Sequence, residues 1–142
     1  MTDHILVSTD NKIKTLTFNR PEKKNAITQS MYGIMADEIL DYGTNDDIRA
    51  LVITGTGDMF TAGNDLADFS AGGGDEEPHV LRFLRAISEC PKPLIAAVNG
   101  GAIGVGLTML LHFDLVYASE SASFSVPFVQ LGLVPEAASS IL

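Results

Sequence analysis

A short apolar strand runs directly into a glycine-rich turn and then into a helix-like stretch. The strand, Leu-Ile-Ala-Ala-Val at residues 94–98, is followed by Asn-Gly-Gly-Ala-Ile-Gly-Val-Gly at residues 99–106. The first N–H groups of a helix have no acceptor within the helix, and the positive end of the helix dipole lies behind them. Such a turn therefore binds negative charge. The anion is either a phosphate or an oxyanion that exists only during a reaction.

The order of the predicted elements indicates an α/β protein. Alternating or apolar runs predict strands at residues 5–9, 13–18, 50–54, 94–98, 115–118 and 122–125. Helical spacing predicts helices at residues 28–43 and 78–90, from the glycine turn to residue 112, and from about residue 136 onward. The first two strands flank Asp10-Asn11, a good hairpin turn pair. Repeated strand–loop–helix units are typical of the α/β class.

The last predicted helix has barely begun at Leu142, and residues 139–142 hold no helix stop signal. We expect the chain to be part of a longer protein, or this end to pack on another component. Residues 1–142 are then one domain whose core is partial. The glycines and acids of residues 72–77 predict a mobile surface segment.

Composition excludes several classes of function. A formal charge of −9 argues against nucleic-acid binding, which needs clustered Lys and Arg. The N-terminus lacks the features of a signal peptide, and no apolar run approaches the ~18–20 residues of a membrane span, so we expect a cytoplasmic protein without a membrane partner. The three histidines are far apart in sequence and the single cysteine has no partner, so no metal site is predicted.

The usual motifs of nucleotide and hydrolase sites do not fit the glycine turn. A dinucleotide fingerprint fails because Met109 stands where its third glycine belongs, and the Gly-Lys-Ser/Thr of a P-loop is absent. A serine hydrolase elbow, Gly-x-Ser-x-Gly, is also absent. His112 lies on an apolar stretch and is interpreted as a packing histidine.

A second loop, at Ala62-Gly63, also precedes a helix-like segment. Two such loops can each offer a main-chain N–H to one point, and two preorganised donors form an oxyanion hole. The only basic cluster, Arg20 with Lys23 and Lys24, is large enough for one phosphorylated ligand, although taken alone it is better explained as a solvated turn.

The chain resembles the crotonase superfamily, the enoyl-CoA hydratase/isomerase family, over nearly its whole length. The stretches that carry the resemblance are Phe-Asn-Arg-Pro at residues 18–21 with Lys-Asn-Ala at 24–26, Phe-Thr-Ala-Gly-Asn-Asp-Leu at 60–66, residues 93–106, and Asp-Leu-Val-Tyr-Ala at 114–118. The resemblance implies a spiral of ββα units, acyl-coenzyme A thioester substrates, and a homotrimer or hexamer. It implies no cofactor, because coenzyme A is part of the substrate.

The resemblance also implies roles for individual residues. The N–H groups of Ala62 and Val105 would stabilise an enolate formed from the thioester. Substrate-binding residues would be Lys24, Ala26, Ala62, Gly63, Asn64, Asp65, Leu66, Gly104, Val105 and Phe128. Within this set, Lys24 and Ala26 would lie near the adenine and phosphates of coenzyme A, and residues 62–66 would line the channel for pantetheine and acyl chain.

The hydratase branch of this family uses two glutamates, and here Thr108 and Phe128 take their places. Glu136, after Pro135, resembles instead the single glutamate of the Δ3,Δ2-enoyl-CoA isomerase branch. It would take a proton from C2 of a 3-enoyl thioester and return it at C4. An apolar wall including Phe128 would raise its pKa toward the useful range.

The predicted function is therefore enoyl-CoA isomerisation. Two alternatives remain open at this point: an enoyl-CoA hydratase or another crotonase reaction, and a catalytically inactive fragment that binds coenzyme A thioesters.

Overall fold

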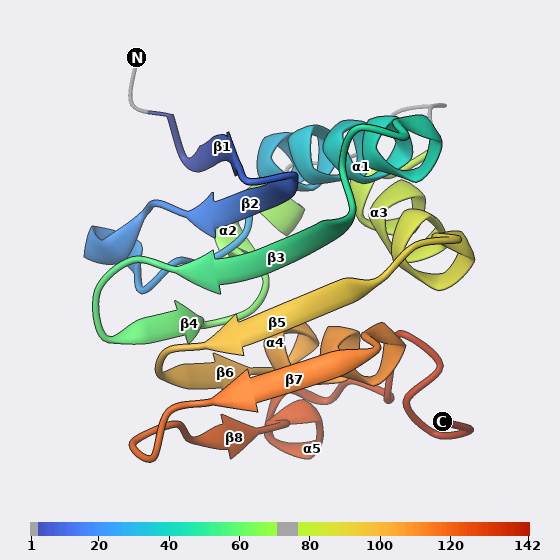
Figure 1. Ribbon diagram of the computed structural model, residues 1–142. Helices are drawn as coiled ribbons and strands as arrows, with labels where there is room; N and C mark the ends of the chain where they lie inside the picture. The colour runs from blue at the N-terminus through green and yellow to red at the C-terminus, as the bar shows by residue number, and fades with distance from the viewer. Residues whose placement is uncertain (1–2, 71–76) are drawn as a thin grey trace.

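The computed structural model describes residues 3–70 and 77–142 (Figure 1). Its strands are β1 (Ile5–Asp10), β2 (Ile13–Phe18), β3 (Ala50–Gly55), β4 (Met59–Thr61), β5 (Leu94–Val98), β6 (Gly101–Ile103), β7 (Leu115–Ala118) and β8 (Phe124–Ser125). Its helices are α1 (Gln29–Thr44), α2 (Leu66–Ser70), α3 (His79–Glu89), α4 (Val105–Thr108) and α5 (Phe128–Leu131), with 3-10 turns η1 (Pro21–Lys23) and η2 (Met109–His112). The predicted mobile segment at residues 72–77 lies, except for Glu77, outside the described residues.

The larger sheet has the strand order β1-β2-β3-β5-β7. Only the β1–β2 pair is antiparallel; the other pairs are parallel. The hairpin turn is formed by Asn11 and Lys12, with φ angles of 48° and 67°, one residue later than predicted. Positive φ at both turn residues is the geometry of the hairpin turn that matches strand twist.

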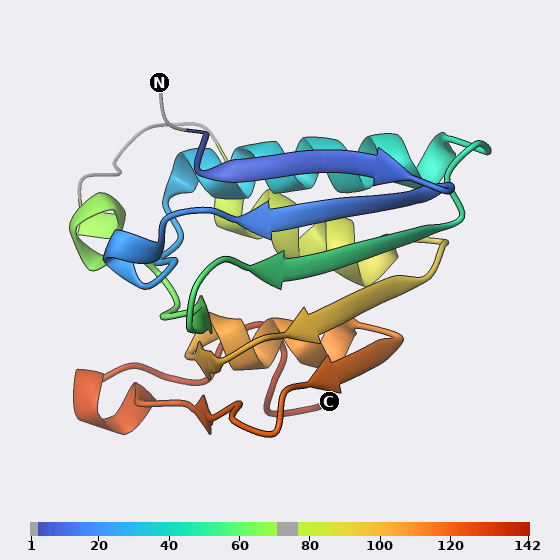
Figure 2. The same cartoon turned by 60° about the vertical axis from the view of Figure 1, so that its left-hand side comes forward.

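Helices α1 and α3 and the continuous α4–η2 segment lie on one side of this sheet (Figure 2). The Thr28 side chain caps α1 by accepting a hydrogen bond from the Met31 N–H, as its position before the apolar stripe predicts. On α1, Tyr32 is fully buried, whereas Ile34 is 40% exposed.

The smaller sheet is parallel, in the order β4-β6-β8. Each of its strands follows a strand of the larger sheet and precedes a helix, which gives the units β3-β4-α2, β5-β6-α4 and β7-β8-α5. This repetition confirms the α/β class and the spiral of ββα units. The predicted glycine loop is wrong in one respect, because residues 101–103 form β6.

The C-terminal segment differs from the prediction. The helix expected from Glu136 is absent from the described chain, and residues 137–141 form turns. Ala137 and Ala138 have φ angles of 53° and 57°, a left-handed conformation that opposes a right-handed helix. In the part of the chain that the structure describes, none of the helices combines the length and apolarity needed to cross a membrane.

Candidate active site

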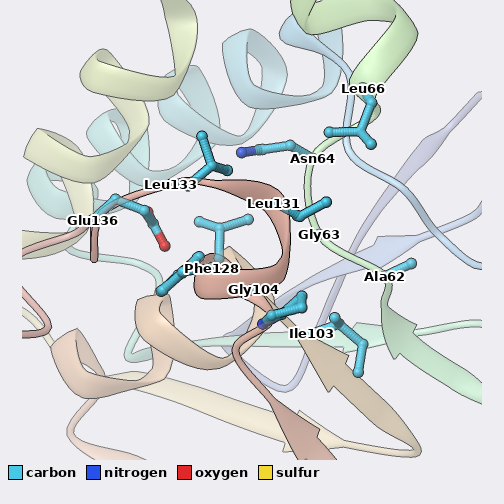
Figure 3. A pocket seen from close by; sticks show the side chains of 12 residues that line it. Ala62, Gly63, Asn64, Leu66, Ile103, Gly104, Phe128, Leu131, Leu133 and Glu136 are labelled. Atoms are coloured by element: carbon cyan, nitrogen blue, oxygen red, sulfur yellow. The ribbon is translucent and has the colours of Figure 1, made fainter.

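A cavity of about 120 Å³ lies where the three strands of the smaller sheet end (Figure 3). The carboxyl ends of parallel strands meet at one edge of a sheet, and this edge is where open α/β sheets bind ligands. The cavity is lined by residues that follow β4, β6 and β8: Ala62, Gly63, Asn64, Leu66, Ile103, Gly104, Val105, Pro127, Phe128, Leu131, Leu133 and Glu136. Most of the residues predicted to bind substrate are therefore brought together.

Two glycines allow the loops after β4 and β6 to approach closely. Gly63 has a φ of +90°, and a Cβ at this position would lie 2.8 Å from the Ile103 carbonyl oxygen. A Cβ at Gly106 would lie 2.6 Å from Thr61 Cγ2. Real Cβ atoms do not come this close, so a side chain at either position would push the two loops apart.

The Ala62 N–H is not available to a ligand, which corrects the prediction for this residue. It donates to the Lys24 carbonyl oxygen at 2.9 Å. This bond anchors the loop after β4. Ala62 therefore forms part of the cavity wall but offers no free N–H donor.

The Gly63 N–H is also engaged, because it donates to Thr61 Oγ1 at 3.1 Å, so the next N–H along the cavity wall belongs to Asn64. Asn64 pairs with Ile27 in a parallel bridge, in which the Ile27 N–H donates to the Gly63 oxygen (2.8 Å) and the Asp65 N–H to the Ile27 oxygen (2.9 Å). Successive N–H groups of an extended segment point to opposite sides. The Asn64 N–H therefore faces away from Ile27.

Val105 begins α4 directly after β6. Its N–H belongs to the first helical turn, whose donors have no acceptor within the helix. The Gly104 carbonyl accepts from Leu107 and Thr108, at 3.0 and 3.1 Å, and so starts the helix. Gly104 itself has φ 58° and ψ −122°, a conformation suited to glycine.

Among the described residues that line the cavity, Glu136 supplies the one carboxylate, and Figure 3 shows its side chain directed into the cavity. The Thr108 hydroxyl donates to Glu136 Oε1 at 2.5 Å, and Thr108 is almost fully buried. Partial burial raises the pKa of the Glu136 carboxyl, while the Thr108 hydrogen bond and the charge of His112 act in the opposite direction. Such an environment moves a carboxyl toward the pKa of a useful general base.

A second cavity, of about 660 Å³, continues from the first and shares Glu136 with it. Its wall is mainly aliphatic: Leu66, Val80, Leu81, Leu84, Leu131, Leu133 and Val134, with Asn64 and Glu136. Leu81 and Leu84 come from α3, where Leu81 is 51% exposed and Leu84 only partly buried. They form cavity wall, and Phe83 takes the core position.

Tyr32 and Asn64 form a polar pair at the junction of the two cavities. The Tyr32 hydroxyl donates to Asn64 Oδ1 at 2.6 Å. Burial, and secondly the charge of Glu136, raise the pKa of the Tyr32 phenol well above its usual range, so it remains a neutral donor. With Oδ1 engaged, the Asn64 amide nitrogen is directed into the cavity, as Figure 3 shows.

Three residues predicted to bind substrate, Lys24, Ala26 and Asp65, do not line either cavity. Asp65 Oδ2 instead accepts from Arg20 Nη1 at 2.6 Å, and this ion pair, with the hydrogen bonds of the Ala67 and Asp68 N–H groups, lowers the pKa of the carboxyl. Arg20 also donates to the Ala26 carbonyl (3.1 Å).

Arg20 is therefore a structural side chain and does not belong to a phosphate site. Lys23 ends η1 and Lys24 follows it; both are exposed and lie outside the cavities. Their predicted contact with coenzyme A phosphates stays a prediction.

Sequence reasoning missed three contributors to the site. Tyr32 was hidden by its place in an apolar helix, and Thr108 was treated only as the residue that replaces a glutamate. His112 was interpreted as packing, yet its Nε2 lies 2.8 Å from the Ala137 carbonyl oxygen. The available signal was the spacing of Thr108 and His112, which places both on one helix face. Among the described residues, no group of three His, Cys, Asp or Glu side chains is placed to hold a metal ion.

Comparison with known proteins places this site in a family. The profile of the family described as enoyl-CoA hydratase/isomerase matches residues 8–142. The chain belongs to this family. The structure of an enoyl-CoA hydratase/isomerase from Pseudoalteromonas atlantica T6c superposes with a TM-score of 0.94 at 56% identity, covering 99% of this chain and 56% of that one.

Curated relatives in the hydratase/isomerase family carry two kinds of name. Enoyl-CoA delta isomerase 2 of Rattus norvegicus is 49% identical over 96% of this chain and 36% of its own length. A probable enoyl-CoA hydratase of Mycobacterium tuberculosis is 40% identical over 94% of this chain and 54% of its own length. The chain thus spans about a third to a half of these relatives, and isomerases and hydratases both occur among them.

Proposed function

We propose that this protein is an enoyl-CoA isomerase that moves the double bond of a 3-enoyl-CoA thioester to C2. The observation that carries the proposal is the carboxylate of Glu136, which lines the cavity and faces the two loops that follow β4 and β6. The name of the 49% identical rat relative supports the same reaction.

In this proposal the thioester oxygen is held between the N–H groups of Asn64 and Val105. The loops that carry them are kept close by Gly63 and Gly106. When a proton leaves C2, negative charge develops on this oxygen, and preorganised N–H donors stabilise that charge more than they stabilise the neutral carbonyl. Asn64 replaces Ala62 as the first donor, because the Ala62 N–H is already bonded to Lys24.

Glu136 acts as the single acid and base. Its carboxylate takes the C2 proton, the electrons form the enolate, and the resulting carboxylic acid returns the proton at C4 while the double bond forms between C2 and C3. Because the proton returns to the same substrate, this reaction requires no bound water. The raised pKa of Glu136 supports both halves of the cycle, since a carboxyl with a pKa nearer the working pH both accepts and releases a proton readily.

The 660 Å³ cavity is proposed to hold the acyl chain. Its aliphatic wall, with Leu81 and Leu84 from α3, matches the chemistry of a hydrocarbon chain, and it opens beside Glu136. Coenzyme A phosphates would then meet the exposed Lys24 on the turn after η1, the same turn whose carbonyl anchors the loop after β4. Assembly as a homotrimer or hexamer stays a prediction.

Hydration is the second candidate, because a probable hydratase is among the relatives. In the cavity described here, the Thr108 hydroxyl is committed to Glu136 and Phe128 presents a hydrocarbon ring. Neither side chain can deprotonate water near neutral pH. We therefore favour isomerisation by one carboxylate.

The test supplies 3-enoyl-CoA and 2-enoyl-CoA separately to the purified protein at its natural length. We expect the ultraviolet absorbance of the conjugated thioester to rise with the first substrate and to stay constant with the second. Loss of conjugation from 2-enoyl-CoA, with no migration in 3-enoyl-CoA, would contradict the proposal. Binding of both thioesters without turnover would instead support the inactive, binding-only alternative.

A further inference from the structure

The turn that carries Glu136 is backbone-strained, and a single helix face contacts it at two points. Ala137 and Ala138, directly after Glu136, both have left-handed φ angles of 53° and 57°. Residues with a Cβ rarely adopt this conformation, and they persist in it only where the surroundings hold them.

The two contacts come from residues four positions apart on the continuous α4–η2 segment. The Thr108 hydroxyl donates to Glu136 Oε1 (2.5 Å), and His112 Nε2 lies 2.8 Å from the Ala137 carbonyl oxygen. Because a carbonyl only accepts, the imidazole nitrogen that faces it carries the proton. One bond thus fixes the carboxylate and the other fixes the backbone next to it.

The same segment begins at Val105, whose N–H is the proposed oxyanion donor. The distance between base and donor is therefore set within one short helix and the turn bound to it. We propose that His112 is a positioning residue, which holds the Ala137 carbonyl and so keeps Glu136 at the distance from the oxyanion donors that proton transfer needs. This inference rests on the proposed role of Glu136.

Two substitutions at His112 distinguish the contribution of its N–H donor from that of the ring as a whole. His112→Leu keeps an apolar side chain but removes the N–H, whereas His112→Gln replaces it with an amide N–H at similar reach. Misplacement of a reacting group by a fraction of an ångström to 1 Å lowers rates by up to ~10²-fold. We expect kcat for 3-enoyl-CoA to fall about tenfold in His112→Leu and to recover to within about threefold of wild type in His112→Gln. KM should stay unchanged in both, because His112 lies outside the cavity linings.

A control variant, His4→Leu, removes an imidazole from the segment before β1 and should leave kcat unchanged. A second readout does not depend on activity. The Ser139 N–H donates to the Glu136 carbonyl (3.0 Å), so its hydrogen exchange reports whether the turn is closed. We expect faster exchange of this amide in His112→Leu than in wild type or His112→Gln.

Wild-type kcat and wild-type exchange in a folded His112→Leu variant would overturn the inference, and so would equal losses of kcat in the Leu and Gln variants. If the wild type fails to isomerise 3-enoyl-CoA, the proposed function fails. The exchange measurement then still decides the inference about the turn: faster exchange in His112→Leu alone supports it, and equal exchange in all variants overturns it.

Discussion

The two halves of the candidate site are built in opposite ways. The loops after β4 and β6 are buried or half-buried and follow regular strands, in which Thr61 and Ala102 are fully buried. The segment after α5 that carries Glu136 is irregular and largely exposed, with Val134 and Ile141 at 80% and 84% exposure. The main chain and glycine packing therefore fix the anion-binding half, whereas a few side-chain contacts fix the base.

This difference indicates which half of the site depends on side-chain identity. Main-chain donors stay in place through most side-chain substitutions, so in the proposed mechanism enolate stabilisation by the two loops is a property of the fold. The proposed base depends on Glu136 and on the residues that contact its turn, so under this proposal the choice of reaction lies in that half.

The largest effect is expected from Glu136→Gln, which keeps the shape of the side chain but removes the base. General acid–base catalysis contributes about 10²–10⁴-fold, so kcat for isomerisation should fall by roughly 10³-fold. Binding of an acyl-CoA thioester, measured by calorimetry, should be retained because the donors and the aliphatic cavity are unchanged. A variant that keeps wild-type turnover would remove Glu136 from the mechanism.

Gly63→Ala tests the half of the site that is formed by the loops after β4 and β6. The new Cβ would collide with the Ile103 oxygen and separate the two loops, so kcat/KM should fall by about 10²-fold, comparable to the loss of an oxyanion-hole donor. Gly104→Ala is the matched control: its φ of +58° imposes strain, but its Cβ would meet no atom within 4 Å. Steady-state kinetics should show a loss at least tenfold smaller in the control. Equal losses in both variants would mean that strain alone, without loop separation, explains the effect.

Thr108→Val is expected to change the pH dependence more than the maximal rate. The Thr108 hydrogen bond stabilises ionised Glu136 and lowers its pKa, so its loss raises the pKa further. Activity that depends on ionised Glu136 should then appear at higher pH, and the acid limb of the kcat–pH profile should move upward. Thr44→Val removes a hydroxyl that donates to the exposed Asp41 carbonyl and serves as the control. An acid limb that stays in place or moves to lower pH would contradict the claim that the Thr108 hydrogen bond lowers the pKa of Glu136.

Tyr32→Phe is expected to have the smallest effect. It leaves Asn64 Oδ1 without its donor and lets the side-chain amide turn, while the Asn64 N–H stays in the main chain. We expect kcat/KM to fall about threefold and the free energy of unfolding to fall by about 1 kcal/mol. Tyr42→Phe removes a hydroxyl that donates to the Pro93 carbonyl, so denaturant titration should show a similar loss of stability with unchanged kinetics. A loss of activity as large as that of Glu136→Gln would give the Tyr32 hydroxyl a direct role in the chemistry.

The sequence predicted the elements with strong periodicity and the glycine positions, because both follow from local chemistry. It predicted Ala62 as a donor, but a long-range bond from its N–H to Lys24 decides otherwise. It also predicted a helix after Glu136, since Pro-Glu-Ala-Ala favours one locally. In the structure, Ala137 and Ala138 instead have left-handed backbone φ angles. The contacts of Thr108 and His112 with that turn join residues 25 to 28 positions apart, which no local pattern reveals.

The central claim is that one carboxylate moves a proton within the substrate and adds no water. The most direct test incubates the protein with 3-enoyl-CoA in water enriched in oxygen-18 and measures the product by mass spectrometry and proton NMR. We predict a product of unchanged mass with its double bond at C2 and no heavy oxygen. Unreacted 3-enoyl-CoA, together with a 3-hydroxyacyl product that carries oxygen-18 when 2-enoyl-CoA is supplied in the same water, would contradict the account and favour hydration.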